Sequence, residues 1–381
     1  MWLDRLRKIT KSKAQIIAGI MSGTSADAID VAICEFLRSS NKPRLVSFYS
    51  RPMPKLLKGV IRKGERLVAS EVAELNFLLG HEFFEALKSA LTKARLAMNA
   101  IDLIGSHGQT IYHHSGKSGL MSTLQVADGD IIATRSGVPV FSDFRMKDIS
   151  LGGEGAPLTP YVDAVMFGAS KIRAVLNLGG IANLTLIQAR SAHTLGFDVG
   201  PANAPLDRLV RIITNGRESF DRNGKRASSG KVNIALLKSE LAKDLFLRRK
   251  PPKSAGVELY GDDFVEKLIQ SHGRADNDLL ATVVEMIATS IGRAFNTWAK
   301  APELVIAGGG AKNLFLVKRI TELVNPANVL LSDRLGVPSE ARESMAFAVL
   351  AREALFGVKA GCHMATGASR ESILGKLSLP D

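Results

Sequence analysis

The sequence predicts an α/β protein built from two units, and three observations support this. Apolar runs with strand spacing alternate with segments of helical spacing along all 381 residues. The chain is longer than most single compact domains, and its 46% of hydrophobic residues can fill a large core. A strand, a glycine turn and a second strand occur in succession twice, about one lobe apart. We expect a first lobe over residues 14–170 and a second over residues 171–381.

The first lobe begins with the segment "IMSGTSADAIDVAI". Its two apolar runs, residues 15–22 and 28–36, predict a hairpin around the turn Gly23-Thr24-Ser25. A long helical segment and two short buried strands are expected next, at residues 71–98, 101–106 and 138–142.

The second lobe begins near residue 173 with "AVLNLGGIANLTLI", a second pair of strands around Gly179-Gly180. The segment "TLGFDVGPAN" follows, and then a long helix is expected over residues 278–300. The segment "ELVIAGGGAKNLFLVKRI" predicts a strand, a turn at Gly308-Gly309-Gly310 and a helix. The similar hairpins of the two lobes indicate a duplicated architecture.

Composition narrows the class of protein. No run of about 18 apolar residues is present, so we expect a cytoplasmic protein with no membrane partner. The two cysteines, Cys34 and Cys362, form no CxxC pattern, which argues against a disulfide framework or a zinc site. The net charge of +13 is scattered except in "DRLRKITKSK" and "LFLRRKPPKS", and no nucleic-acid-binding motif accompanies it. A basic surface that suits an anionic substrate is the preferred interpretation, without a nucleic-acid partner.

The three glycine turns are candidates for phosphate binding. Glycine lets backbone N–H groups approach phosphate oxygens closely, although a single such turn is more often only a tight connection. Their joint order is similar to the phosphate, phosphate and adenosine elements of the actin, hexokinase and sugar-kinase superfamily. That resemblance implies a two-lobed actin-like (ribonuclease-H-like) ATPase fold with an interlobe cleft. No Walker A motif is present, and the triple glycine does not fit GxGxxG.

Longer motifs make the resemblance more specific. They include "MSGTSADAID", "GSHGQTIYH", "GGEGAPLTP", "FDVGPANAPLD", "PPKSAGVE", "AGGGAKN" and "GVPSEARESMAFAVLA". With these, the chain resembles the anhydro-N-acetylmuramic acid kinases of bacterial cell-wall recycling nearly end to end. The resemblance implies that ATP, Mg²⁺ and water are used to open the 1,6-anhydro bond of the amino sugar and to phosphorylate O6. The partners would be this small-molecule substrate and ATP, and a homodimer is left open.

The resemblance also implies two catalytic carboxylates. Water that attacks the anomeric carbon needs a general base, and Asp198 in "FDVGPAN" matches that role. Asp198 is expected to end a strand, and its competing interpretation is a turn-stabilising aspartate. Glu343 matches the family's acid before the Ala-Phe-Ala run, as a second carboxylate or a sugar ligand. From the local pattern alone, Glu343 could be a favourable first-turn carboxylate.

The remaining site residues follow from the same motifs. Expected substrate contacts are His107, Gln109, Thr110, Asp143 and Arg145, with an ordinary salt bridge as the competing account for Asp143 and Arg145. A zinc role for His107 and His113 is rejected, because no third ligand has suitable spacing. Asp27 is the candidate magnesium ligand. The expected nucleotide-binding residues are Gly23, Thr24, Ser25, Asp27, Gly179, Gly180, Asn183, Gly308, Gly309, Gly310 and Asn313.

Two alternative functions stay open on the sequence. A conventional amino-sugar or hexose kinase of the same superfamily would use Asp198 to deprotonate the sugar hydroxyl. A nucleotide-switched binding protein would have no sugar substrate. The chain departs from the family pattern at Ala28, Val199 and Ala202, which puts the geometry beside Asp198 in question.

Overall fold

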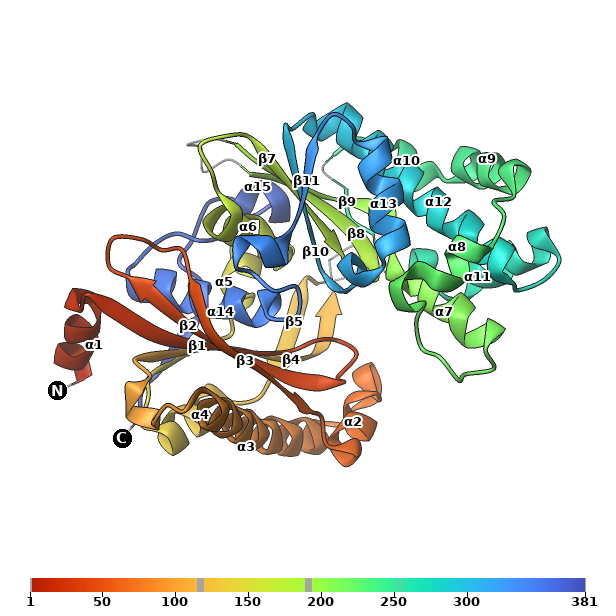
Figure 1. Cartoon of the computed structure of the whole chain (residues 1–381). Coiled ribbons are helices and arrows are strands. Elements are labelled where there is room, and N and C mark those ends of the chain that lie inside the picture. The colour runs from red at the N-terminus through yellow and green to blue at the C-terminus, as the bar shows by residue number, and fades with distance from the viewer. Residues whose placement is uncertain (1, 115–119, 189–193, 252, 256, 381) are drawn as a thin grey trace. The chain divides into compact units, whose positions relative to one another are not determined.

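The computed structural model describes residues 2–114, 120–188, 194–251, 253–255 and 257–380, and its elements are labelled in Figure 1. The chain forms two compact units, one of residues 1–166 with 341–381 and one of residues 167–340. The expected division differs from this one, because it assigned residues 341–381 to the second lobe. Those residues lie in the first unit because the helix at 342–355 packs on that unit's sheet.

The first unit is built on a seven-stranded sheet in the order β12-β6-β4-β1-β2-β3, with β5 paired to β4. Strands β1 and β2 form the expected antiparallel hairpin, while β1, β4 and β6 are mutually parallel. The strands are β1 (Ala14–Ser22), β2 (Ala28–Leu37), β3 (Arg44–Pro52), β4 (Leu103–His114), β5 (Ser122–Val126), β6 (Val140–Ser142) and β12 (Lys376–Ser378). Strand β4 is twice as long as expected, so that "GSHGQTIYHH" lies in a strand rather than at its end.

Helices cover both faces of this sheet. Side chains alternate between the faces of a strand, and Ala18 and Ile20 of β1 pack in one cluster with Leu79 and Phe83 of α3. Gly19 between them faces α14 on the opposite side. The helices of this unit are α1 (Trp2–Lys11), α2 (Lys55–Ile61), α3 (Ala69–Ala94), α4 (Gly129–Ser136), α5 (Met146–Ile149), α6 (Thr159–Phe167, which reaches the unit boundary), α14 (Arg342–Leu355) and α15 (His363–Thr366).

The second unit repeats the sheet topology of the first. Its five strands run in the order β11-β10-β7-β8-β9, with β8 antiparallel to both neighbours and β10 parallel to β7 and β11. They are β7 (Arg173–Leu178), β8 (Ile181–Ile187), β9 (Thr194–Pro201), β10 (Glu303–Ala307) and β11 (Asn328–Leu331). When the strands of each unit are counted along the chain, both sheets contain the order third, second, first, fourth: β3-β2-β1-β4 and β9-β8-β7-β10. This is the order of ribonuclease-H-like folds. The predicted α/β fold and its duplication are therefore confirmed.

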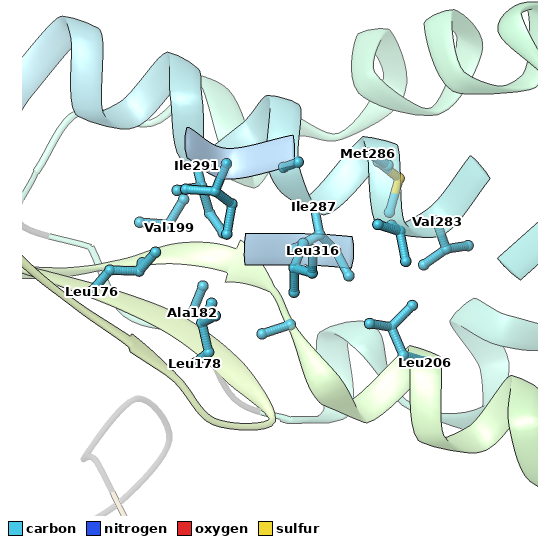
Figure 2. Packing of buried hydrophobic residues seen from close by; sticks show 14 of the residues in the cluster. Leu176, Leu178, Ala182, Val199, Leu206, Val283, Met286, Ile287, Ile291 and Leu316 are labelled. Carbon is cyan, nitrogen blue, oxygen red and sulfur yellow. The ribbon is translucent and has the colours of Figure 1, made fainter. Parts of the chain in front are cut away.

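Helix α12 (Asn277–Ala294) forms the centre of the second core. Val283, Ile287 and Ile291 pack against Leu316 and against strand residues such as Val199 (Figure 2). The helix continues into one π-helical turn, Phe295–Ala299, which matches the expected helix to residue 300. The other helices are α7 (Asn203–Ile213), α8 (Lys225–Ser229), α9 (Ile234–Lys243), α10 (Leu245–Arg248), α11 (Asp262–His272) and α13 (Leu314–Leu323). Among the described residues, no helix is both long and apolar enough to cross a membrane.

Candidate active site

A cavity of about 510 Å³ in the first unit brings together two sets of residues that the sequence assigned separately. The hairpin turn, expected to hold phosphate, lines it beside residues expected to hold the sugar. The predicted residues in its lining are Gly23, Thr24, Ser25, His107, Thr110, Arg145 and Glu343. The turn expected to bind phosphate and most of the residues expected to bind the sugar therefore line one cavity in the first unit.

Helix α14 forms one wall of this cavity through Glu343, Phe347 and their neighbours on one face. Two strand glycines allow the helix to approach the sheet. A Cβ at Gly19 would lie 1.8 Å from the carbonyl oxygen of Ser344, and one at Gly105 would lie 2.1 Å from that of Phe347. Sequence reasoning missed both residues, although a glycine inside an apolar strand is a signal of close backbone approach.

The side chain of Gln109 fixes the turn after β1 through a hydrogen bond. Its Nε2 donates to the carbonyl oxygen of Gly23 at 3.1 Å, and the amide of Ala26 donates to the same oxygen at 2.9 Å. Gln109 is completely buried and does not line the cavity. Gln109, expected as a substrate contact, therefore lies against the turn that follows β1 and outside the cavity lining. Its hydrogen bond holds this turn in position.

Gly23 has open space on its Cβ side. A Cβ there would meet no protein atom within 4 Å, and its φ is not among the positive ones. Neither the packing of the described residues nor backbone strain therefore explains glycine at this position. Room is therefore left beside the turn, whose backbone N–H groups can act as hydrogen-bond donors.

His107, which is buried, and Arg145, which is half-buried, form a pair at the cavity wall. Arg145 Nε donates to His107 Nε2 at 3.0 Å, so the other ring nitrogen, Nδ1, carries the proton that faces the carbonyl oxygen of Gly108 at 3.1 Å. Burial, together with the charge of Arg145, holds the pKa of His107 well below its usual value. The ring also packs on Phe347 with centroids 4.5 Å apart. His107 is thus a neutral acceptor that orients the guanidinium.

The charges of Arg145 and Glu343 act on each other across the cavity. Burial lowers the pKa of Arg145 to about 10, and the charge of Glu343 partly offsets this effect. Arg145 Nη1 donates to the carbonyl oxygen of Gly155 at 2.9 Å, which fixes the plane of the guanidinium. Glu343 lies in the first turn of α14 and is exposed. A buried ion pair between the preceding residue on the helix, Arg342, and Asp163 anchors this end of α14.

Two predicted acids are paired with lysines and lie outside the cavity lining. Asp143 forms a salt bridge with Lys376 at 2.5 Å. A salt bridge was the competing interpretation of Asp143, and its partner is Lys376 rather than Arg145. Asp27 is hydrogen-bonded to Lys58, and that contact is the largest cause of its lowered pKa. No group of three potential metal ligands occurs among the described residues.

In the second unit, Asp198 is held by four contacts. Asn183 Nδ2 donates to Asp198 Oδ1 at 3.0 Å. The amide of Ala255 and the hydroxyl of Ser254 donate to Oδ2 at 2.8 and 3.3 Å, and the amide of Asp198 donates to the carbonyl oxygen of Lys253 at 3.0 Å. Asp198 lies within β9 rather than at its end, because β9 continues to pair with β8 through Pro201. The segment 253–255, quoted above in "PPKSAGVE", had no assigned role in the sequence analysis.

The triple glycine borders a cavity of about 610 Å³ in the second unit. Gly308 and Gly310 are required by packing, because a Cβ at either would lie within 2.6 Å of Asn177 or Leu178. A Cβ at Gly309 would meet only Asn203, at 3.9 Å, so Gly309 leaves room for a ligand. Asn313 also borders the cavity, and its Oδ1 accepts the amide of Leu316 as the cap of α13.

The backbone of Gly179 and Gly180 is hydrogen-bonded to the first residues of α7. Their carbonyl oxygens accept the amides of Asn203 and Ala202 at 3.0 Å. Neither glycine is in the lining of the 610 Å³ cavity. Asp207 of α7 does line it and was not predicted; burial raises its pKa to about 6.

Comparison with known proteins gives a consistent result. A family model described as anhydro-N-acetylmuramic acid kinase matches residues 15–380. The chain is 36% identical to the anhydro-N-acetylmuramic acid kinase of Caldanaerobacter subterraneus subsp. tengcongensis, over 99% of this chain and all of that one. It is 37% identical to the enzyme of that name from Francisella tularensis subsp. novicida, over 96% and 99% of the two chains, and 36% identical to that of Clostridioides difficile, over 94% and 97%.

Two solved structures align over most of the chain at 13% identity. They are an activator of 2-hydroxyisocaproyl-CoA dehydratase from Clostridium difficile with bound ADPNP, and a ROK family glucokinase from Streptomyces griseus with glucose and AMPPNP. They cover 90% and 89% of this chain and 96% and 99% of their own, with TM-scores of 0.45 and 0.38. With scores this low, the fold assignment rests on the strand order instead.

Proposed function

Because the chain belongs to the anhydro-N-acetylmuramic acid kinase family, we propose that it phosphorylates O6 of 1,6-anhydro-N-acetylmuramic acid with ATP while water opens the anhydro bond. The product is N-acetylmuramic acid 6-phosphate, and the role is in peptidoglycan recycling. The observation that carries this proposal is the family match over residues 15–380. We further propose that the enzyme works in the cytoplasm on a small-molecule substrate, without a nucleic-acid partner.

Asp198 is the proposed general base. Its three side-chain hydrogen bonds, from Asn183, Ser254 and Ala255, fix the orientation of the carboxylate. The carboxylate takes one proton from the attacking water as the water oxygen bonds to the anomeric carbon. The bond from that carbon to O6 breaks, and O6 bonds to the γ-phosphorus of ATP while the bond from that phosphorus to the β-phosphate oxygen breaks and ADP leaves. The new anomeric hydroxyl then carries the solvent oxygen.

The cavity of the first unit is the proposed sugar and phosphate site. Arg145 presents a guanidinium that His107 and Gly155 orient, and this group suits the lactyl carboxylate of the substrate. Glu343, on the wall formed by α14, accepts a hydrogen bond from a sugar hydroxyl or acts as a second carboxylate near the attacking water. Thr24, Ser25 and the backbone at Gly23 donate to phosphate oxygens.

The phosphates of ATP suit the turn at Gly23, where a Cβ would meet no protein atom within 4 Å; in the second unit a Cβ at Gly309 would meet only Asn203, at 3.9 Å. When bound, ATP supplies the phosphoryl group that O6 receives. The fit of Asp27 to Mg²⁺ is poor, because its carboxylate is already paired with Lys58. We propose instead that Mg²⁺ is held mainly by phosphate oxygens and water, as is usual for this ion.

The test of the reaction is a product assay in ¹⁸O-labelled water, read by mass spectrometry. The anomeric hydroxyl should carry the label and the phosphate should not, provided that the product is reduced early to stop exchange with solvent. Unlabelled product carried through the same steps is the control. Plain N-acetylmuramic acid, assayed in parallel, distinguishes a conventional sugar kinase, which would phosphorylate it readily. Label in the transferred phosphoryl group would overturn the proposed reaction.

A further inference from the structure

A third cavity, of about 670 Å³, lies in the second unit where α9, α10 and α12 meet β9. It shares no lining residue with either cavity described above. Its apolar lining comes from β9, α9, α10 and the π-helical turn after α12, through Val199, Leu241, Leu247 and Trp298. The cavity is therefore a separate site with a substantial hydrophobic wall.

Among the described residues, five cationic side chains also line this cavity, and no carboxylate is in the lining. They come from three segments: Lys238 from α9, Arg293 from α12, and Arg248, Arg249 and Lys253 from the basic segment "LFLRRKPPKS". Within the described part of the chain, none of the five has a carboxylate oxygen within 4.0 Å. By contrast, Lys243 on α9 pairs with Glu240 at 3.1 Å.

Two of the five are held in place by backbone carbonyl groups. Lys253 Nζ donates to the carbonyl oxygen of Phe246 at 3.1 Å, and Arg248 donates to that of Ala242. Such neutral acceptors orient a cation without cancelling its charge. Five positive charges around one hollow repel each other and attract an anion.

We propose that this cavity binds an organic anion that joins a phosphate or carboxylate group to an apolar body. The anionic group would lie among Lys238, Lys253 and Arg293, and the apolar body would pack on Leu241, Leu247 and Trp298. Recognition by both parts excludes a bare inorganic ion as the preferred ligand. The site also gives part of the high positive charge a specific role.

The cavity adjoins the strand that carries Asp198. Val199, the next residue of β9 and the extra residue at the register shift between β8 and β9, lines the cavity. Lys253 lines the cavity with its side chain, while its carbonyl oxygen accepts the amide of Asp198 at 3.0 Å. An anion bound there contacts the segment that holds Asp198 and therefore alters turnover. This second step rests on the proposed function of Asp198, and the binding site itself does not.

Binding can be measured with a reporter that the chain already contains. Its two tryptophans are Trp2 and Trp298, so the Trp2→Phe variant leaves only the one in the cavity wall. Titration with phenyl phosphate should give a saturable change in Trp298 emission that weakens with added salt. Inorganic phosphate should bind more weakly. Saturating ATP and the anhydro sugar should leave the titration unchanged.

The variant that tests the site combines Lys238→Gln with Arg293→Gln. Both side chains are exposed, and their loss should weaken phenyl phosphate binding at least about tenfold, as expected for hydrogen bonds to charged groups. Lys243→Gln, on the same helix as Lys238 but outside the lining, is the matched control and should bind normally.

The binding proposal is overturned by any of three results: no saturable emission change, equal binding by the double variant, or displacement of phenyl phosphate by ATP. Equal affinity for inorganic phosphate would also overturn it, since the apolar wall would then have no function. Turnover is read separately. If phenyl phosphate binds as expected but changes turnover equally in the double variant, or not at all, the link to Asp198 is wrong and the site stands.

Discussion

Asn183 and Asp198 lie directly opposite each other on β8 and β9, and the Asn183 amide donates to the Asp198 carboxylate at 3.0 Å. The pairing register of two adjoining strands therefore orients the proposed base. A second support comes from the segment 253–255, which bonds to the other carboxylate oxygen. An aspartate held from two sides keeps one orientation, which would preorganise it for the proposed role as general base.

The first prediction concerns Asp198→Asn. The amide keeps the shape of the side chain but cannot accept the proton of water, so kcat should fall by about 10²–10⁴. ATP affinity should be nearly unchanged, because the substitution alters only the proposed proton acceptor. Steady-state kinetics and nucleotide titration measure the two quantities. Asp263→Asn, an exposed acid of α11, is the control and should retain activity. Near-normal turnover by Asp198→Asn would remove this residue from the mechanism.

The second prediction compares Gly23→Val with Gly59→Val. A Cβ at either position meets no protein atom within 4 Å, so both variants should fold. Only Gly23 lines the 510 Å³ cavity, and a branched side chain there should keep phosphate away from the turn. Calorimetric titration should show weakened ATP binding for Gly23→Val and ordinary binding for Gly59→Val. Equal affinities would mean that the turn after β1 does not contact the nucleotide.

The third prediction is that Gly19→Ala destabilises the first unit. The added Cβ would lie 1.8 Å from the carbonyl oxygen of Ser344, so α14 must shift away from β1. Overpacking of this kind typically costs about 1–3 kcal/mol. Urea denaturation measures the free energy of unfolding. Gly59→Ala, where the new methyl group meets open space, should be neutral or slightly stabilising. A Gly19→Ala protein as stable as the wild type would contradict the close packing of α14.

The fourth prediction is a pH dependence of stability. Since the pKa of His107 is well below its usual value in the folded chain, the unfolded chain binds the extra proton first as the pH falls. Above pH ~6.5 the protonation of His107 therefore does not reduce the free energy of unfolding. Below that pH it reduces this free energy by about 1.4 kcal/mol for each pH unit. His107→Gln keeps an acceptor for Arg145 and does not titrate.

Denaturation curves recorded from neutral pH down to about pH 5 test this expectation, because the titration begins near pH 6.5. The wild type should lose stability faster than His107→Gln as the pH falls. His113, whose pKa is also lowered by burial, adds a smaller slope to both proteins. Parallel curves for the two proteins would show that the pKa of His107 is not lowered in the folded chain.

Much of the fold could be predicted because its signals are local. The alternation of apolar residues gave the hairpin of β1 and β2 and the hairpin of β7 and β8 within a residue or two. The two glycine turns indicated the duplication that the strand orders confirm. Strand β4 was predicted too short, since polar residues such as His113 and His114 interrupt its apolar pattern while its backbone still pairs with β5.

The sequence by itself determined the family, the α/β class and the residue types of the site, because these depend on local patterns and on motifs of neighbouring residues. Only the tertiary structure decided which partner each polar group found. In the folded chain Asp27 pairs with Lys58 and Asp143 pairs with Lys376. Gln109 donates a hydrogen bond to the turn after β1, and residues 341–381 belong to the first unit. Gln109 is 86 residues from Gly23, and Lys376 is more than 200 from Asp143. Such pairs are set by strand register and helix packing, whose energies depend on the whole core rather than on any one segment.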